Sequence, residues 1–199
     1  MSTSDVIDFH RREQKKYIDL YIDKDKSYKL LHDKRGYGAV NHGKRAQKLI
    51  LSLSPKSLCD VGTGQGQFCV WAAKKGIKAV GVDIASVLLG KVIHYPGVAY
   101  YSGEARSLPL KSKSVDLVTS FDVLEHCLPE DIDTIIKEFF RVARKALVLK
   151  ISYRQARERS LDGQVLHMTV RSKFWWKEKL SVVSSVKEVD KYLVCTIKK

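Results

Sequence analysis

The segment Asp60-Val61-Gly62-Thr63-Gly64-Gln65-Gly66 constrains the fold of this chain more than any other stretch. A short apolar run at 57–61 leads into it, and the spacing of apolar residues over 67–75 predicts a helix directly after it. Glycine leaves room for a ligand and allows backbone angles that other residues avoid, and the first turn of a helix presents unpaired N–H groups. The order strand, glycine turn, helix therefore predicts a site for a nucleotide-like ligand.

The chain after Pro55 continues as an alternation of strands and helices. We expect strands at 57–61, 78–82, 98–102, 115–120 and 146–151, and helices at 67–75, 86–92 and 131–141. Such alternation favours a parallel sheet with helices on both faces. After a helix at 174–180, two strand-like runs at 181–187 and 191–198 predict an antiparallel hairpin at the sheet edge. The expected fold is an α/β three-layer sandwich around a mostly parallel, seven-stranded sheet.

Length and composition indicate a single globular domain. The 199 residues are enough to bury a core, and we divide them into a basic, helical cap segment at 1–53 and a core at 54–199. No apolar run reaches the roughly 18 residues that a membrane helix needs, and the N-terminus lacks an apolar signal-peptide core. We therefore expect a cytoplasmic protein, in the host cytoplasm if the source is a virus, that is a monomer or a dimer.

The spacing of cysteines and histidines gives no support to a metal centre. The four cysteines form no C-x-x-C pair, so we expect buried free thiols rather than zinc ligands or disulfides. The six histidines stand far apart in the sequence and form no H-x-x-x-H or H-E-x-x-H pattern. We therefore expect no metal site.

The spacing of the glycines argues against two common nucleotide sites. The dinucleotide-binding pattern G-x-G-x-x-G places its third glycine where this chain has Gln67, which argues against NAD or FAD. The phosphate-binding pattern G-x-x-x-x-G-K-[ST] is also absent. The form G-x-G-x-G, preceded by an acid, resembles the first motif of class I S-adenosylmethionine-dependent methyltransferases.

The resemblance continues in order over residues 55–152. Gly81-Val82-Asp83-Ile84 ends the second expected strand with an acid, Gly103-Glu104-Ala105 follows the third, and Phe121-Asp122-Val123-Leu124-Glu125-His126 follows the fourth. It implies a Rossmann-like fold, with S-adenosylmethionine as methyl donor and S-adenosylhomocysteine as product. The cofactor-binding residues that it implies are Asp60, Gly62, Thr63, Gly64, Gly66, Asp83, Ile84, Glu104, Ala105, Phe121 and Asp122.

The resemblance also implies roles for some of these residues. Asp83 is expected to accept hydrogen bonds from both ribose hydroxyls, which a carboxylate has the lone pairs to do. Glu104-Ala105 stands where the family usually has Asp-Ala beside the adenine amino group, so the backbone is the expected contact there. The segment 121–126 is expected to line the methionine side of the pocket.

Three side chains are candidates for a general base, which speeds methylation of a hydroxyl by roughly 10²–10⁴. Glu125 and His126 follow the fourth expected strand. His167 precedes Phe174-Trp175-Trp176, an aromatic run that suits a sugar or another flat acceptor. Structural roles are the alternative, with Glu125 orienting the next helix, His126 packing on the cofactor and the tryptophans in the core.

The acceptor stays open between two classes. The compact core favours O-methylation of a small-molecule or saccharide hydroxyl. The net charge of +14 and the arginines at 154, 157 and 159 favour RNA, either a cap or tRNA, or another polyanion. A non-catalytic binding protein that keeps this fold is a third hypothesis.

Overall fold

The computed structural model describes residues 43–85, 92, 94–156, 163, 165–182 and 184–197. Residues 1–42 of the basic segment at 1–53 lie outside the described residues, and so does most of the helix expected at 86–92. Among the described helices, none has the length and apolar character needed to cross a membrane. The proposed division at residue 53 stays a prediction.

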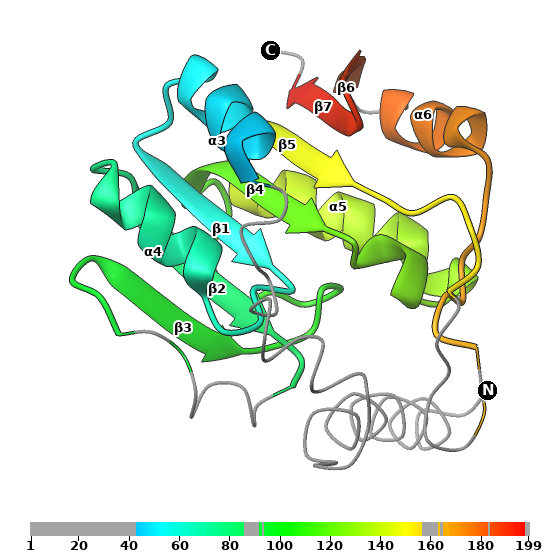
Figure 1. Cartoon of the computed structure of the whole chain (residues 1–199). Coiled ribbons are helices and arrows are strands. Elements are labelled where there is room, and N and C mark those ends of the chain that lie inside the picture. The colour runs from blue at the N-terminus through cyan, green and yellow to red at the C-terminus, as the bar shows by residue number, and fades with distance from the viewer. Residues whose placement is uncertain are drawn as a thin grey trace.

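Seven strands of the described chain form one sheet (Figure 1). Their order is β3-β2-β1-β4-β5-β7-β6. The first five pair in parallel, whereas β7 runs antiparallel to both β5 and β6. This arrangement confirms the mostly parallel sheet with an antiparallel hairpin at its edge. The strands are β1 Ser57–Val61, β2 Lys78–Asp83, β3 Val98–Ser102, β4 Val115–Phe121, β5 Ala143–Lys150, β6 Ser184–Val189 and β7 Tyr192–Ile197.

Helices cover both faces of the sheet and form two separate cores. On one face, α3 and α4 bury Ile50 and Phe68 against Leu58 and Leu117 of the sheet. On the other face, α5 and α6 bury their apolar sides in a cluster with Val118 and Leu147. The fold is therefore a three-layer, Rossmann-like sandwich. The helices are α3 Gly43–Ser52, α4 Gln67–Lys74, α5 Ile132–Val142 and α6 Lys173–Ser181, with short 3-10 turns η3 Leu124–His126 and η4 Pro129–Asp131.

Strand β5 begins at Ala143, three residues before the start expected from the sequence. The early start includes Arg144 and Lys145, whose charges argue against a buried strand when the sequence is read alone. Both side chains instead bind the carboxylate of Asp116 in β4, at 2.9 Å for Arg144 Nη2 and 3.1 Å for Lys145 Nζ. An ion pair across neighbouring strands thus extends β5 beyond its apolar run.

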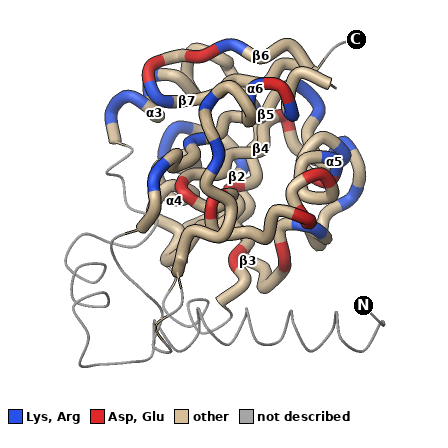
Figure 2. Tube along the Cα trace, turned by 90° about the vertical axis from the view of Figure 1, so that its right-hand side faces the viewer, with Lys and Arg blue, Asp and Glu red and all other residues tan. Residues whose placement is uncertain are grey.

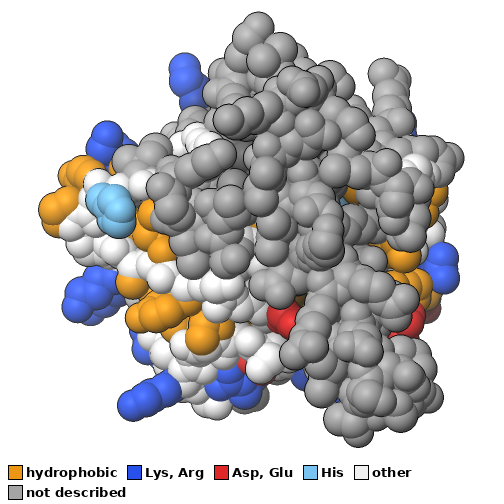
Figure 3. All heavy atoms as spheres, turned by 90° about the horizontal axis from the view of Figure 1, so that it is seen from below, with side chains coloured by type: hydrophobic (Ala, Val, Ile, Leu, Met, Phe, Trp, Pro, Cys, Tyr) orange, Lys and Arg blue, Asp and Glu red, His pale blue; other side chains and the backbone are white. Residues whose placement is uncertain are grey.

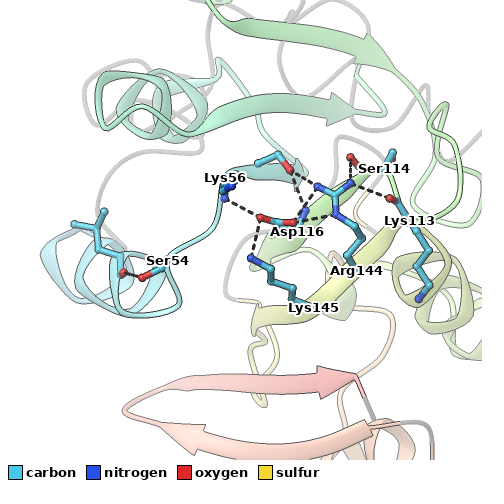
Figure 4. A network of polar contacts seen from close by, with 9 residues as sticks. Ser54, Lys56, Lys113, Ser114, Asp116, Arg144 and Lys145 are labelled. Atoms are coloured by element: carbon cyan, nitrogen blue, oxygen red, sulfur yellow. Dashed lines mark hydrogen bonds and ion pairs between the residues drawn. The ribbon is translucent and has the colours of Figure 1, made fainter. Parts of the chain in front are cut away.

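Asp116 joins the beginnings of three strands (Figure 4). Its side chain is 5% exposed and also accepts a 2.8 Å hydrogen bond from the backbone N–H of Lys56, next to β1. Burial disfavours the charged carboxylate, but the Lys56 N–H and the cations of Lys145 and Arg144 outweigh it and lower the pKa of Asp116 to about 2. This cluster lies at the amino ends of the parallel strands, whereas the glycine turn lies at their carboxyl ends.

Candidate functional site

The residues expected to bind the cofactor gather at the carboxyl ends of the parallel strands. In Figure 1 the arrowheads of β1, β4 and β5 point toward the same side of the molecule. The glycine turn follows β1, Asp83 ends β2, Glu104 follows β3, and the segment from Asp122 follows β4. Ligands of open α/β sheets bind at this edge, so the topology places the predicted residues where a cofactor is expected.

The glycine turn uses backbone angles that favour glycine. Gly62, Gly64 and Gly66 have φ values of +76°, +57° and +82°. A Cβ at Gly62 would lie 2.2 Å from Val123 Cγ2, and one at Gly66 would lie 2.3 Å from the hydroxyl of Tyr100. The turn is therefore packed tightly from both sides, and a side chain at position 62 or 66 would force its neighbours to move.

Asp60 lies below the turn rather than on its surface. It is 3% exposed, and its Oδ1 accepts a 2.7 Å hydrogen bond from the Thr119 hydroxyl of β4. Thr63 is fully buried, with its hydroxyl 3.3 Å from Cys69 Sγ. Burial raises the pKa of Asp60 to about 7, against the lowering effect of the bonds from Thr119 and Thr63. These contacts suit residues that position the turn, and direct cofactor contact by Asp60 and Thr63 stays a prediction.

Asp83 is held by the backbone around the predicted ribose site. Its Oδ2 accepts a 2.8 Å hydrogen bond from Gly64 N–H, and its Oδ1 accepts a 2.9 Å bond from Ala85 N–H. Burial raises the pKa of Asp83, while the backbone N–H groups of Ala85, Gly64 and Ile84 lower it. Because a carboxylate has about four acceptor positions, these bonds do not use all of its capacity. Ribose binding by Asp83 stays a prediction, and the bond to Gly64 ties Asp83 to the glycine turn.

The predicted adenine contacts follow β3. The carboxylate of Glu104 binds Arg106 Nε at 2.6 Å, and Ala105 is partly buried beside the core. Gly103 N–H donates to Asp83 O at 3.0 Å, which joins this loop to the end of β2. Because the Glu104 side chain already pairs with Arg106, these contacts agree with a backbone role at Glu104-Ala105.

The residues after β4 have two different environments. The ring of Phe121 packs edge-on against Phe68 and Tyr192, at centroid distances of 5.1 and 5.8 Å, so it belongs to the core. Asp122 has a φ of +55° and forms an ion pair with Lys150 at the end of β5. Lys150 belongs to no sequence motif. Only the pairing of β5 with β4 in the folded sheet brings it beside Asp122 and identifies it as part of the site.

Glu125, His126 and His167 meet in one cluster, which we call the Glu-His-His cluster. The two imidazole rings are 4.8 Å apart, centroid to centroid, and perpendicular. Glu125 is 0% exposed. Its Oε1 accepts a 3.1 Å bond from Ser152 N–H, whereas its Oε2 has no hydrogen-bond partner among the described residues. Burial, and secondarily the charge of Asp122, raise the pKa of Glu125 to about 8.

Backbone hydrogen bonds hold His167 in this cluster. Thr169 N–H donates to Glu125 O at 3.0 Å, and the Thr169 hydroxyl donates to Cys127 O at 2.8 Å. Leu166 O lies 3.0 Å from His126 Nδ1. The segment 165–170 therefore lies along η3. It brings His167 to Glu125 and His126, which stand far from it in the sequence. His126 and His167 are thus neighbours in space although they stand far apart in the sequence, and the expectation of no metal site stays a prediction.

The aromatic run after His167 is divided between core and surface. Trp176 is fully buried, so the interpretation that it stacks on an acceptor was wrong. Trp175 is partly exposed, with the cations of Arg171 and Lys179 at 5.9 and 5.5 Å from its ring. Burial of Trp176 anchors α6 to the sheet and leaves Trp175 facing charged neighbours.

Comparison with known proteins supports the assignment of the fold. Residues 59–149 match a family model described as a methyltransferase domain. An uncharacterized methyltransferase from Synechocystis sp. is 32% identical over 96 residues, which are 47% of this chain and 45% of that protein. Norajmaline N-methyltransferase from Rauvolfia serpentina is 32% identical over 111 residues, 51% of this chain and 37% of that protein. The matched part thus spans less than half of these curated relatives.

Solved structures share the fold over nearly the whole chain. A 1,6-didemethyltoxoflavin-N1-methyltransferase from Burkholderia thailandensis, with bound 1,6-didemethyltoxoflavin and S-adenosylhomocysteine, has a TM-score of 0.63 at 13% identity. It covers 100% of this chain and 91% of its own. A protein from Pyrococcus horikoshii has a TM-score of 0.64 at 17% identity and covers 91% and 96%. The resemblance inferred from the motifs is confirmed: residues 59–149 match a methyltransferase domain, and the chain shares the Rossmann-like fold of these solved structures.

Proposed function

We propose that this chain transfers the methyl group of S-adenosylmethionine to a hydroxyl oxygen of a small-molecule or saccharide acceptor. The supporting observation is that the glycine turn, buried Asp83 and the Glu-His-His cluster share one edge of the sheet. When bound, S-adenosylmethionine supplies a methyl group that its sulfonium sulfur already activates. The protein has to hold both partners in line and provide for the proton of the acceptor.

The residues of the chain divide this work. Gly62, Gly64 and Gly66 allow close approach to the backbone, and Asp83 accepts from the ribose hydroxyls. Ile84 and Glu104-Ala105 lie beside the adenine of the cofactor. Phe121-Asp122 lines the side of the pocket that holds its methionine part. As the acceptor oxygen bonds to the methyl carbon and the carbon–sulfur bond breaks, the hydroxyl proton leaves at the Glu-His-His cluster. Glu125, His126 and His167 are the candidates to act there.

Binding of S-adenosylhomocysteine, measured by calorimetry, tests the donor site. Asp83→Ala should weaken binding by about 10- to 150-fold, because a hydrogen bond to a charged group contributes roughly 1.5–3 kcal/mol. The matched control is Asp133→Ala, which removes a carboxylate that is 60% exposed on α5. An unchanged affinity in Asp83→Ala contradicts the ribose assignment, and an intact chain that binds neither the donor nor its product overturns the proposal.

The acceptor atom is tested by product analysis. A curated relative and a solved structure are both named N-methyltransferases, which makes an amine the competing acceptor. Matched phenol–aniline and sugar–aminosugar pairs, incubated with S-adenosylmethionine and the full chain, distinguish the two by the mass and position of the methyl group. Methylation of only the nitrogen compounds overturns the hydroxyl assignment. Cofactor binding without any turnover over a broad panel favours the non-catalytic hypothesis.

RNA is the second candidate because the net charge is +14. In the described part of the chain, Lys and Arg are spread over α3, α4, α5 and the region of β6 (Figure 2). Seen from below, they stand apart around the rim, between hydrophobic and uncharged atoms (Figure 3). A gel-shift series in rising salt tests this candidate, since binding through phosphates weakens steeply with salt. Weak binding with a shallow salt slope removes it.

A further inference from the structure

The Glu-His-His cluster has the composition of a metal site. Its three residues each offer one ligand atom, and these atoms lie within 4.8 Å of one another. Two imidazole nitrogens and one carboxylate oxygen suit divalent transition metals, zinc among them. A carboxylate oxygen that is buried with no partner in the described part of the chain is costly, and Glu125 Oε2 is such an atom. A cation at this point would satisfy it.

The hydrogen bonds around the two imidazoles suit metal binding as well. His126 Nδ1 lies 3.0 Å from Leu166 O, and His167 Nδ1 contacts Arg154 O. A carbonyl only accepts, so each Nδ1 must carry the proton and each Nε2 the lone pair. Metal-binding histidines in proteins are usually oriented in this way, with the second ring nitrogen donating to a carbonyl or a carboxylate. These contacts therefore make Nε2 the nitrogen that carries the lone pair in each ring.

We propose that Glu125, His126 and His167 bind one divalent transition-metal ion, for which zinc is the probe. Bonds of about 2.0–2.2 Å in a tetrahedral site separate ligand atoms by about 3.4 Å, so a pair at the 4.8 Å limit must close by about 1.4 Å. Small rotations of the side chains achieve this. Three protein ligands leave a fourth position open, where an acceptor hydroxyl can bind and lose its proton to solvent more easily. That last role rests on the proposed function and takes the place of a general base there, because a side chain that binds the metal does not also accept the proton. The metal site itself does not rest on the proposed function.

Zinc binding by the full, metal-stripped chain tests the proposal. Calorimetry should give one tight site in the intact chain, and Glu125→Gln and His167→Ala should each weaken it at least about tenfold. The matched control is His94→Ala, because His94 is exposed and stands outside the cluster. Cobalt, titrated into the same variants, should give a visible absorption band that the two cluster variants lose and His94→Ala keeps.

Two measurements separate the possible failures. Binding of S-adenosylhomocysteine and the urea midpoint show whether each variant remains folded. A folded intact chain that takes up neither zinc nor cobalt overturns the proposal, as does a His167→Ala variant that binds zinc as tightly as the intact chain. Zinc binding without any binding of S-adenosylhomocysteine would overturn the methyltransferase proposal and leave the metal site standing.

Discussion

Asp116→Asn should destabilise the protein by about 1–2 kcal/mol at pH 7. The substitution keeps the shape of the side chain and removes the charge that Lys56 N–H, Arg144 and Lys145 bind. The pKa of Asp116 lies at about 2, against 3.8 for an ordinary carboxyl. At 1.36 kcal/mol per unit, this difference corresponds to about 2.5 kcal/mol. Solvent screens part of it, because the side chains of Arg144 and Lys145 are 44% and 51% exposed.

The sign of the pH dependence follows from the lowered pKa. Stability from the Asp116 carboxylate is fully present above the unfolded pKa near 3.8 and is lost as pH falls toward about 2. The difference between the intact chain and Asp116→Asn should therefore be constant from pH 7 to about pH 5. It should fall to about half at pH 3.

Urea unfolding followed by tryptophan fluorescence, at steps from pH 7 to pH 3, measures this difference. The control is Asp133→Asn. The carboxylate of Asp133 is 60% exposed and pairs with Lys179, so its removal should change the free energy of unfolding by less than about 0.5 kcal/mol. A difference between the intact chain and Asp116→Asn that is absent at pH 7, or that does not change between pH 5 and pH 3, refutes the reasoning.

Three further predictions concern the glycine turn, the core under α6 and the buried carboxyl group of Asp60. Gly66→Ala should cost about 1–3 kcal/mol of stability and weaken binding of S-adenosylhomocysteine, since position 66 has a φ of +82° and abuts Tyr100; unchanged urea and calorimetric titrations would contradict this. Trp176→Ala should cost about 3–5 kcal/mol of unfolding free energy because the side chain is fully buried, whereas Trp175→Ala should cost much less; equal losses would show that the core assignment is wrong. Asp60→Asn should stabilise the protein by about 1–2 kcal/mol at pH 8 and by less at pH 5, because the raised pKa of Asp60 makes its ionisation costly as pH rises. An effect independent of pH would argue that Asp60 is ionised without penalty.

Local patterns in the sequence predicted the donor half of the site. The glycine turn and Asp83 each stand at a strand end, and parallel strands bring such ends to one edge of the sheet. Glu125, His126 and His167 were each predicted as candidates for a general base, but their meeting in one cluster could not be predicted in this way. Thr169 brings His167 beside His126 through hydrogen bonds to two backbone carbonyls. No pattern of residues in the sequence predicts these hydrogen bonds.

Strand boundaries failed where side-chain charges find partners in space. Arg144 and Lys145 are typical of a loop when the sequence is read alone, but Asp116 of the neighbouring strand neutralises them within β5. For the same reason Lys150 was missed, since its partner Asp122 follows another strand. Local spacing identifies elements, and long-range pairing decides where they begin and what they contribute.

The contact between Gly62 and Val123 links the two halves of the site mechanically. Val123 immediately precedes η3, which carries Glu125 and His126, and its methyl group occupies the space where a side chain at position 62 would stand. A larger residue at 62 would therefore push η3 away from the turn and displace the carboxylate and imidazole together. The position of the glycine turn and that of the Glu-His-His cluster thus depend on one contact, so a change at that contact alters how the two are aligned without changing the side chains of either.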